Sequence, residues 1–311
     1  MPLLTRKRLI LAKTESVYGT DITPAGTDAV LVRELEITPQ ASDTVERELV
    51  RPYMGAFQQL LANTRVEVTF QVELAGSGTA GTAPRYGSIL KACGFSETVV
   101  ATTSVTYAPI SSSFSSCTIY YNVDGTLHKL TGCRGTFTLN GEVGEIPYIE
   151  FEMTGIYNAP TATALPATTY TNQATPLLFK NGNTTSFQLL SYSGCLQSIE
   201  LEMGNEIVYR ELVGCTKEVL ITDRQVTGTA MIEAVALGTK DYFAAAITEG
   251  ALGNLQFTHG ITAGNIVAVS STAIDIGDVS YEDSDGIQML SIPVIAVPGS
   301  SGNDEISLVF T

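Results

Sequence analysis

Hydrophobic and polar residues alternate strictly between residues 66 and 74. Apolar side chains occupy every second position from Val66 to Leu74. The positions between them hold Glu67, Thr69, Gln71 and Glu73. Because the side chains of a strand point alternately to its two faces, this pattern predicts a half-buried strand. Similar alternation near 30–38, 147–156 and 226–236 predicts three more such strands.

Two segments have the spacing of a helix instead. In residues 86–93 the apolar side chains recur at helical intervals and Gly94 follows, and a second short helix is expected at about 241–249. Asn140-Gly141 predicts a turn. The sequence therefore predicts an all-β fold with one short helix in each half of the chain. Further strands are expected near 104–109, 117–122, 127–131, 134–139, 186–190, 196–203, 206–213, 218–221, 266–270, 273–277, 286–296 and 305–310.

A four-residue stretch occurs twice. Arg47-Glu48-Leu49-Val50 returns as Arg210-Glu211-Leu212-Val213, at an offset of 163 (210 − 47). Other matches follow in the same order: Val66 with Val226, Tyr86 with Tyr242, and Asp124-Gly125 with Asp285-Gly286. Chance similarity among strand-rich segments is the alternative. The ordered series favours a tandem duplication of one β domain, and we expect the two halves to share a fold.

Composition shifts suggest where the copies begin and end. Residues 1–29 form an N-terminal arm, and residues 30–157 form the first domain. Residues 158–176, rich in Ala, Thr and Pro, predict an extended linker, and residues 177–311 form the second domain. The length of 311 residues fits two domains.

The chain is acidic, with a net charge of −15. Residues 1–160 hold 12 Lys/Arg against 16 Asp/Glu, and residues 161–311 hold 5 against 16. Such a chain is a poor candidate for gripping nucleic-acid phosphates. The polar faces of the predicted strands carry Glu with little Lys, whereas ordinary exposed strands mix both signs. Exposure to solvent explains the polar face of any one strand. The recurrence of glutamates on several strands indicates an acidic surface whose electric field has a role. Its candidate residues are Glu34, Glu36, Glu67, Glu73, Glu150, Glu152, Glu200, Glu202 and Glu233.

Catalytic and metal-binding motifs are absent from the sequence. It has no G-x-S-x-G elbow, no H-E-x-x-H and no phosphate-binding loop that opens a helix. The five cysteines include no C-x-x-C pair, and the two histidines lie far from them. Paired glutamates such as Glu150 and Glu152 could serve a glycosidase or a metal site, but no other residue supports either. We expect no enzymatic activity, cofactor or metal.

The first residues are basic. Arg6, Lys7, Arg8 and Lys13 surround the short apolar run Leu9 to Ala12, which is too short for a signal peptide. No apolar run approaches the length of a membrane span. An intracellular chain with reduced thiols is expected. The basic residues predict either a disordered tail or an extended arm that docks on an acidic neighbour.

Two stretches resemble a known family. Leu11-Ala12-Lys13-x-Glu15-x-x-Tyr18-Gly19-Thr20-Asp21-x-Thr23-Pro24, followed by Asp28 to Val32, is similar to major tail tube proteins of long, non-contractile-tailed bacteriophages. The run Ile221 to Thr229 resembles a strand entry of the same proteins. The resemblance implies a β-sandwich or barrel domain flanked by a short helix. It also implies stacked rings of six such domains around a lumen that phage DNA crosses without specific binding.

This chain departs from the family by carrying two such domains. Three chains would then close a ring, giving a homotrimer with pseudo-sixfold symmetry. The resemblance further implies a virion tail protein assembled in the cytoplasm of the host bacterium. Its expected partners are itself and the tape measure, tail terminator and distal tail proteins.

A different class fits the same pattern. Two β domains joined by a Thr/Pro-rich segment also suit a two-domain immunoglobulin-like binding module, such as a capsid decoration protein or an adhesin. Rings or hollow rods in an electron micrograph would distinguish the tube from the module.

Overall fold

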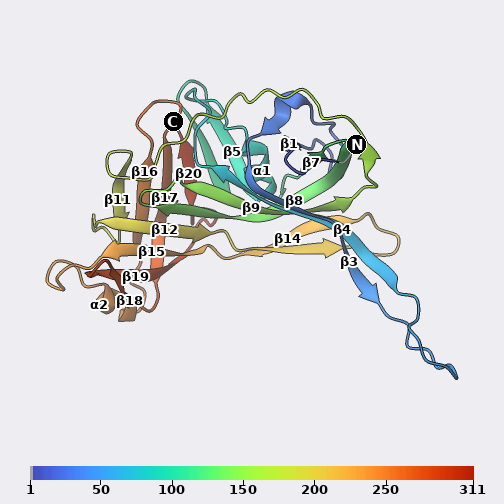
Figure 1. Cartoon of the computed structure of the whole chain (residues 1–311). Helices are drawn as coiled ribbons and strands as arrows, with labels where there is room; N and C mark the ends of the chain where they lie inside the picture. Colours follow the sequence, from blue (N-terminus) through green and yellow to red (C-terminus); the bar gives the residue numbers. More distant parts are fainter. Residues whose placement is uncertain (1–2) are drawn as a thin grey trace.

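The computed structural model describes residues 3–311 and confirms the all-β prediction, with one short helix in each half (Figure 1). No helix in that range is long and apolar enough to cross a membrane. The helices are α1 (Gly87–Ala92) and α2 (Tyr242–Ile247), with one 3-10 turn at Gly26–Asp28. The strands of the first half are β1 (Arg8–Thr14), β2 (Ala29–Val30), β3 (Arg33–Val45), β4 (Leu60–Glu73), β5 (Phe95–Val100), β6 (Ser104–Pro109), β7 (Cys117–Val123), β8 (Thr126–Glu142), β9 (Tyr148–Tyr157) and β10 (Thr161–Ala162). Those of the second half are β11 (Thr184–Leu189), β12 (Leu196–Glu202), β13 (Asn205–Arg210), β14 (Glu218–Arg224), β15 (Thr227–Glu233), β16 (Gly253–His259), β17 (Val267–Ile276), β18 (Ser280–Ser284), β19 (Ile287–Ala296) and β20 (Ser307–Phe310).

An eight-stranded antiparallel sheet runs through both halves of the chain. Its order is β3-β4-β9-β8 in the first half and β12-β15-β19-β18 in the second. The two sets of four strands meet where the last five residues of β8 pair with β12. Figure 1 shows β9, β8, β12 and β15 lying across the molecule one below the other. We call this the long sheet.

The four-strand order recurs with the same register. Glu36 lies opposite Thr69, and Thr69 lies opposite Glu152. In the second half Glu200 lies opposite Thr229, and Thr229 lies opposite Pro293. The offsets are 164 (200 − 36), 160 (229 − 69) and 141 (293 − 152). β12, β15 and β19 therefore stand in the places of β3, β4 and β9.

One of the sequence matches lies outside this correspondence. Asp124-Gly125 joins β7 to β8, whereas Asp285-Gly286 joins β18 to β19. Because β19 stands in the place of β9, the two Asp-Gly turns are not equivalent. Both are short turns in which the glycine has a positive φ, 98° at Gly125 and 82° at Gly286. The geometry of the turn therefore explains the shared Asp-Gly without a common origin.

Six other strands pair into a second series that also joins the halves. β5, β6, β20, β17, β16 and β11 pair in that order. β20, the last strand of the chain, lies between β6 of the first half and β17 of the second, with Leu308 opposite Tyr107. On the other side of the first half, β7 pairs with β1 and with β8.

The inward face of the long sheet is buried as its alternation predicts. Val68, Phe70 and Val72 are fully buried, and the rings of Phe70 and Phe137 each lie 5.6 Å from that of Phe151. Tyr86, just before α1, lies 6.5 Å from Phe151 and donates a hydrogen bond to the Ala75 carbonyl oxygen at 2.8 Å. Its burial raises the pKa of the phenol above its ordinary value.

The turn predicted at Asn140-Gly141 is wrong. Both residues lie within β8, and Gly141 pairs with Ile199 of β12. A Cβ at Gly141 would lie 2.9 Å from a ring carbon of Phe179, so the glycine serves a close approach rather than a turn. The strands expected at 127–131 and 134–139 are likewise one strand, with a bulge between Thr131 and Arg134.

Residues 158–176 lie against the first half along most of their length. β10 pairs with the start of β8, and the backbone N–H groups of Thr163, Thr169 and Ala174 donate to carbonyl oxygens of first-half residues. A Cβ at Gly26 would lie 1.8 Å from the Ala167 carbonyl oxygen, so this contact requires a glycine. The segment follows the surface on its way to β11 (Figure 1).

Replacement of the central aromatic ring tests the packing of this core. Phe151→Ala should lower the free energy of unfolding by about 3–5 kcal/mol, because it removes a fully buried ring that touches three others. Urea denaturation measures the change. Glu152→Gln, the next residue and on the exposed face, is the matched control and should change stability by less than about 0.5 kcal/mol. Equal effects of the two substitutions would contradict this assignment of faces.

Candidate acidic face and assembly surfaces

Eight of the nine predicted glutamates lie on one face of the long sheet. Along one row Gln71, Glu150, Thr138, Glu202 and Thr227 face one another in turn. Residues that lie directly opposite each other on neighbouring strands project to the same side of the sheet. All residues of such a row therefore lie on one face. The eight are Glu36, Glu67, Glu73, Glu150, Glu152, Glu200, Glu202 and Glu233. Five of them are exposed and three half-buried.

Glu34 departs from this arrangement. The register of β3 shifts between Arg33 and Glu36, and Glu34 occupies the bulge with φ 47°. The shift leaves Glu34 without a directly opposite partner on β4 and places Arg33 opposite Gln71. The alternation in the sequence could not predict this, because the extra residue of a bulge changes which side of the sheet the side chains beyond it face.

Arg33 and Arg65 bring positive charge to the first half of the acidic face. The Arg33 Nε donates to Gln71 at 3.0 Å, and the Gln71 amide donates to Glu150 at 2.5 Å. The guanidinium lies 4.4 Å from the centre of the Tyr148 ring. Arg65 pairs with Glu67 at 2.7 Å, and the bond to that carboxylate raises the pKa of Arg65. The rows of the second half lack such pairs on β12 and β15, so that half of the face is more purely acidic.

The basic N-terminal residues lie along a strand of the first half. β1 pairs with β7 over residues 8–14, and Ile10 and Leu11 are buried. Lys7 lies 3.6 Å from Asp124, and Lys13 lies 3.9 Å from Asp28. Arg6 and Arg8 line a shallow hollow at the surface. Residues 8–14 are therefore part of the folded body.

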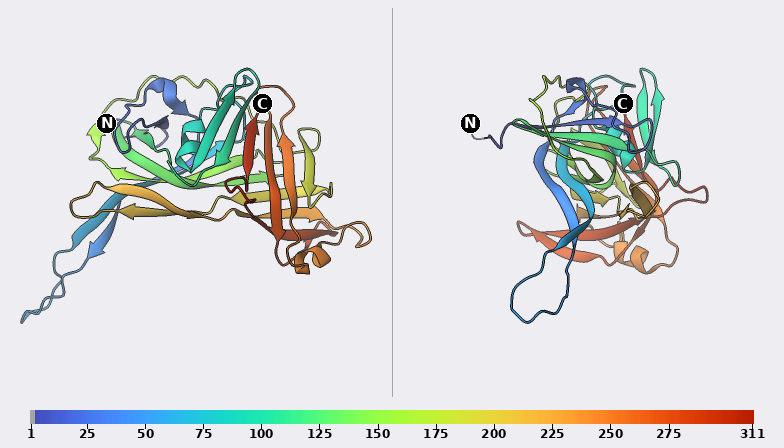
Figure 2. Two further views of the ribbon diagram at one scale, coloured as in Figure 1. Left: turned by 180° about the vertical axis from the view of Figure 1, so that it is seen from behind. Right: turned by 90° about the vertical axis from the view of Figure 1, so that its right-hand side faces the viewer.

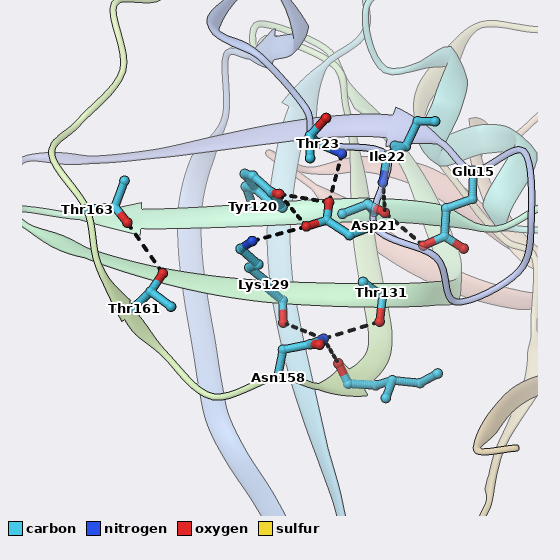
Figure 3. Close-up of polar contacts among 12 residues, drawn as sticks. Glu15, Asp21, Ile22, Thr23, Tyr120, Lys129, Thr131, Asn158, Thr161 and Thr163 are labelled. Carbon is cyan, nitrogen blue, oxygen red and sulfur yellow. Dashed lines mark hydrogen bonds and ion pairs between the residues drawn. The ribbon is translucent and has the colours of Figure 1, made fainter.

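The stretch that carries the family resemblance anchors the N-terminal segment to this body (Figure 3). Asp21 accepts hydrogen bonds from the Tyr120 hydroxyl and the Thr23 N–H, and pairs with Lys129 at 3.1 Å. Burial opposes ionisation of Asp21, but these three donors outweigh it and hold the pKa of the carboxyl below its ordinary value. Glu15 accepts hydrogen bonds from the Gly19 N–H, the Ser116 hydroxyl, the Thr118 hydroxyl and the Gly132 N–H, all at 2.6–2.8 Å.

Tyr18 and Gly19 of the same stretch have structural roles. The Tyr18 hydroxyl accepts a hydrogen bond from the Val219 N–H at 2.5 Å, and Arg134 lies 4.7 Å from its ring. This contact ties the N-terminal segment to β14 of the second half. Gly19 has φ 70°, a left-handed conformation that favours glycine. The motif therefore stabilises the fold.

Both Arg-Glu-Leu-Val copies lie at hairpin tips. The first occupies the loop between β3 and β4, and the second begins at the end of β13 and continues into the loop before β14. Val50 is 103% exposed and Val213 107% exposed, and Leu49 and Leu212 are about half exposed. Figures 1 and 2 show the β3–β4 hairpin extending well beyond the body. The exposed apolar side chains at the two tips are candidates for protein contact.

Reactive groups are poorly placed for chemistry. Within residues 3–311, no three His, Cys, Asp or Glu side chains lie close enough together to hold a metal ion. Cys93, Cys117 and Cys133 are buried, and burial raises the pKa of the Cys93 and Cys133 thiols. The features that the structure offers are an acidic face, open sheet edges and projecting tips.

Comparison with known proteins gives one result. A family model described as phage tail tube protein matches residues 5–311, nearly the whole chain. A search of curated proteins finds no match.

The ion pair and hydrogen bonds of Asp21 give a stability that depends on pH. Because the folded pKa is lowered, this stability is present above the unfolded value of about 3.9 and is lost as the pH falls through the lower folded value. Asp21→Asn should therefore destabilise the protein at pH 7 and have a smaller effect near pH 2. Urea midpoints of both proteins across this range measure it. A difference that stays constant with pH would contradict the role of the charge.

Proposed function

Because the chain belongs to the phage tail tube protein family, we propose that it polymerises into stacked rings whose channel conducts the phage genome during ejection. The chain is a structural protein of the virion tail and not an enzyme. The immunoglobulin-like alternative rested only on the pattern of β strands. The match to the tail tube family covers nearly the whole chain and therefore favours the tail tube.

The acidic face of the long sheet is the observation that carries the proposal. Eight glutamates from both halves line one side of a single sheet. Turned toward the channel, this face repels DNA phosphates and keeps the genome from adhering to the wall as it passes. A conduit that must release its cargo quickly needs such a wall, whereas a DNA-binding protein needs the reverse.

The repeated four-strand order supports a tandem duplication and a trimeric ring. Each chain carries two sets of four strands in one register. Three chains then supply six sets, which gives a homotrimer with pseudo-sixfold symmetry. Head-to-tail contacts around the axis close the ring, and a different contact along the axis extends it into a tube.

The hairpin tips are suited to the axial contact. The two copies of Arg-Glu-Leu-Val stand at equivalent hairpins and expose the same apolar side chains. A change of length lies between the tetrapeptide and the strand that follows it, since the offset falls from 163 at Arg47 to 160 at Val66. The four residues are the same in both hairpins, although the loop beside them differs in length. This agreement is expected if both tips bind the same kind of site, which the next ring presents six times. Arg6 and Arg8 offer a further contact with an acidic surface of that ring.

Other tail proteins complete the assembly. A tape measure protein inside the channel and terminator and distal tail proteins at the two ends are the partners expected of a tail tube. The DNA itself makes no specific contact. We place assembly in the cytoplasm of the host bacterium, before the virion is released.

The mass of the ring tests the trimer. Native mass spectrometry of rings should give three copies of the 33.0 kDa chain, and a tube reconstruction should have threefold symmetry with a sixfold pattern of strands. Rings of six full chains would contradict the proposal.

Acidic substitutions at the two hairpin tips test whether the tips make the axial contact. Val50→Asp with Val213→Asp should leave rings intact but prevent their stacking, because each substitution places a carboxylate in an apolar contact, at a cost of about 2 kcal/mol or more per site. Negative-stain microscopy distinguishes rings from rods. Val143→Asp, an exposed valine on a different loop, is the control and should still give rods. Rods from the double variant would refute the role of the tips.

Charge reversal tests the channel wall. Tubes of the wild-type chain should not retain a short DNA duplex, whereas tubes carrying Glu200→Lys and Glu202→Lys should retain it at low salt and release it as salt rises. Glu249→Lys with Asp278→Lys makes the same change of charge on exposed residues outside the strands of this face. Equal retention by the two variants would count against an acidic channel.

A further inference from the structure

The chain contains two Asn-Gly dipeptides, Asn140-Gly141 and Asn181-Gly182. An asparagine that precedes glycine can lose its side-chain amide, because the backbone nitrogen of the glycine attacks the asparagine Cγ and closes a five-membered ring. Glycine favours this reaction, since it has no Cβ and reaches backbone conformations that other residues avoid. The structure around each dipeptide decides whether the two atoms can meet.

Asn140-Gly141 is held inside the long sheet. Asn140 lies opposite Tyr148 on one neighbouring strand and opposite Glu200 on the other. A Cβ at Gly141 would lie 2.9 Å from a ring carbon of Phe179, so this ring covers the glycine. Closure of the five-membered ring would require β8 to separate from both neighbours. Opening of a core strand costs a free energy that approaches that of global unfolding, so the fold protects Asn140.

Asn181-Gly182 lies in the turn that leads into β11. Both residues are exposed, and a Cβ at Gly182 would meet no atom within 4 Å. Gly182 has φ 87°, a left-handed conformation that favours glycine. Among residues 3–311, no group forms a hydrogen bond with the Gly182 N–H or with the Asn181 side chain. Neither of the two reacting groups is therefore engaged elsewhere.

The next asparagine of the same turn provides a contrast. The side-chain amide of Asn183 donates to the Leu178 carbonyl oxygen at 3.0 Å. The N–H of the residue that follows, Thr184, donates to the Lys180 carbonyl oxygen at 2.9 Å. At Asn183 both the amide and the nitrogen that would attack it are thus engaged. The turn restricts the reaction to Asn181.

We propose that Asn181 is a site of spontaneous deamidation. The deprotonated nitrogen of Gly182 forms a bond to the Asn181 Cγ, and the side-chain nitrogen leaves as ammonia. Water then opens the cyclic imide at either of its two carbonyl groups, which leaves aspartate or isoaspartate at position 181. The net reaction consumes one water, releases one ammonia and involves no oxidant or reductant. It needs no enzyme, because the attacking atom and its target belong to one dipeptide.

The fold around the turn tolerates the product. Before the site, the Phe179 N–H donates to the Glu145 carbonyl oxygen at 2.8 Å. After it, the Asn183 carbonyl oxygen accepts a bond from the Gly260 N–H at 2.8 Å. The extra backbone atom of isoaspartate falls in the exposed residues between these two anchors. The modified chain therefore stays folded, and its net charge changes from −15 to −16 (−15 − 1).

Peptide mapping of the folded, full-length chain tests the site. Trypsin cuts after Lys and Arg, so peptides 135–180 and 181–210 each carry one of the two Asn-Gly dipeptides. During incubation at mildly alkaline pH, which deprotonates more of the attacking nitrogen, peptide 181–210 should convert into two acidic forms. Asn181 should react at least about tenfold faster than Asn140, since a local opening that costs about 1.4 kcal/mol slows a reaction about tenfold. Fragment masses locate the modified residue.

Two comparisons separate the effect of the fold from that of the local sequence. In urea both dipeptides lose their surroundings, so Asn140 and Asn181 should react at similar rates. Asn181→Gln should abolish the reaction at this position in the folded chain, because glutamine would have to close a six-membered ring. Asn172→Gln, at another exposed asparagine, is the matched control and should leave the rate at Asn181 unchanged.

The outcomes decide the proposal without reference to tube assembly. Equal rates at Asn140 and Asn181 in the folded chain would overturn it. So would conversion at Asn183 in place of Asn181, or rates in urea that differ as much as those of the folded chain. Faster conversion at Asn181 that disappears in Asn181→Gln, together with similar rates in urea, would establish it.

Discussion

Five consecutive backbone pairings between β8 and β12 decide what the rest of the molecule can do. They join two sets of four strands into one sheet, so that the glutamates of both halves share a side. A slip of one residue would turn every side chain of β12 to the opposite face and bury Glu200 and Glu202 in the core. The register is fixed from the buried side, where Leu139 meets Leu201 and Gly141 admits the Phe179 ring. The acidic face is thus held in place by apolar packing beneath it.

Much of this could be predicted from the sequence because a strand has a simple period. The alternation at 66–74 placed Val68, Phe70 and Val72 in the core and Glu67 and Glu73 on the other face, as the structure has them. Local spacing also located both helices. The glutamates came together because each lies on the polar side of a regular strand, and their strands are neighbours in one sheet.

The misplaced elements depend on contacts between distant residues. Residues 8–14 form a strand because they pair with β7, which lies more than a hundred residues later in the chain. The local sequence of residues 8–14 does not predict this pairing. Asn140-Gly141 has the composition of a turn, but the ring of Phe179 demands the glycine within a strand. Glu34 has no opposite partner on β4 because a bulge interrupts the period. The N-terminal motif identified the family although its own task is structural, since Glu15 and Asp21 hold the chain to β7 and β8.

The position of β20 has a consequence for the order in which the chain is made. This last strand fills the gap between β6 and β17, and Phe310 packs edge-on against Tyr86 and Tyr107 in the core of the first half. The first half therefore leaves the ribosome with an open edge at β6 and an incomplete core, and it stays so until β20 has been made. A prematurely terminated chain keeps that defect. The body of the first half is thereby completed only after β20, some two hundred residues later in the chain than β6, has been made.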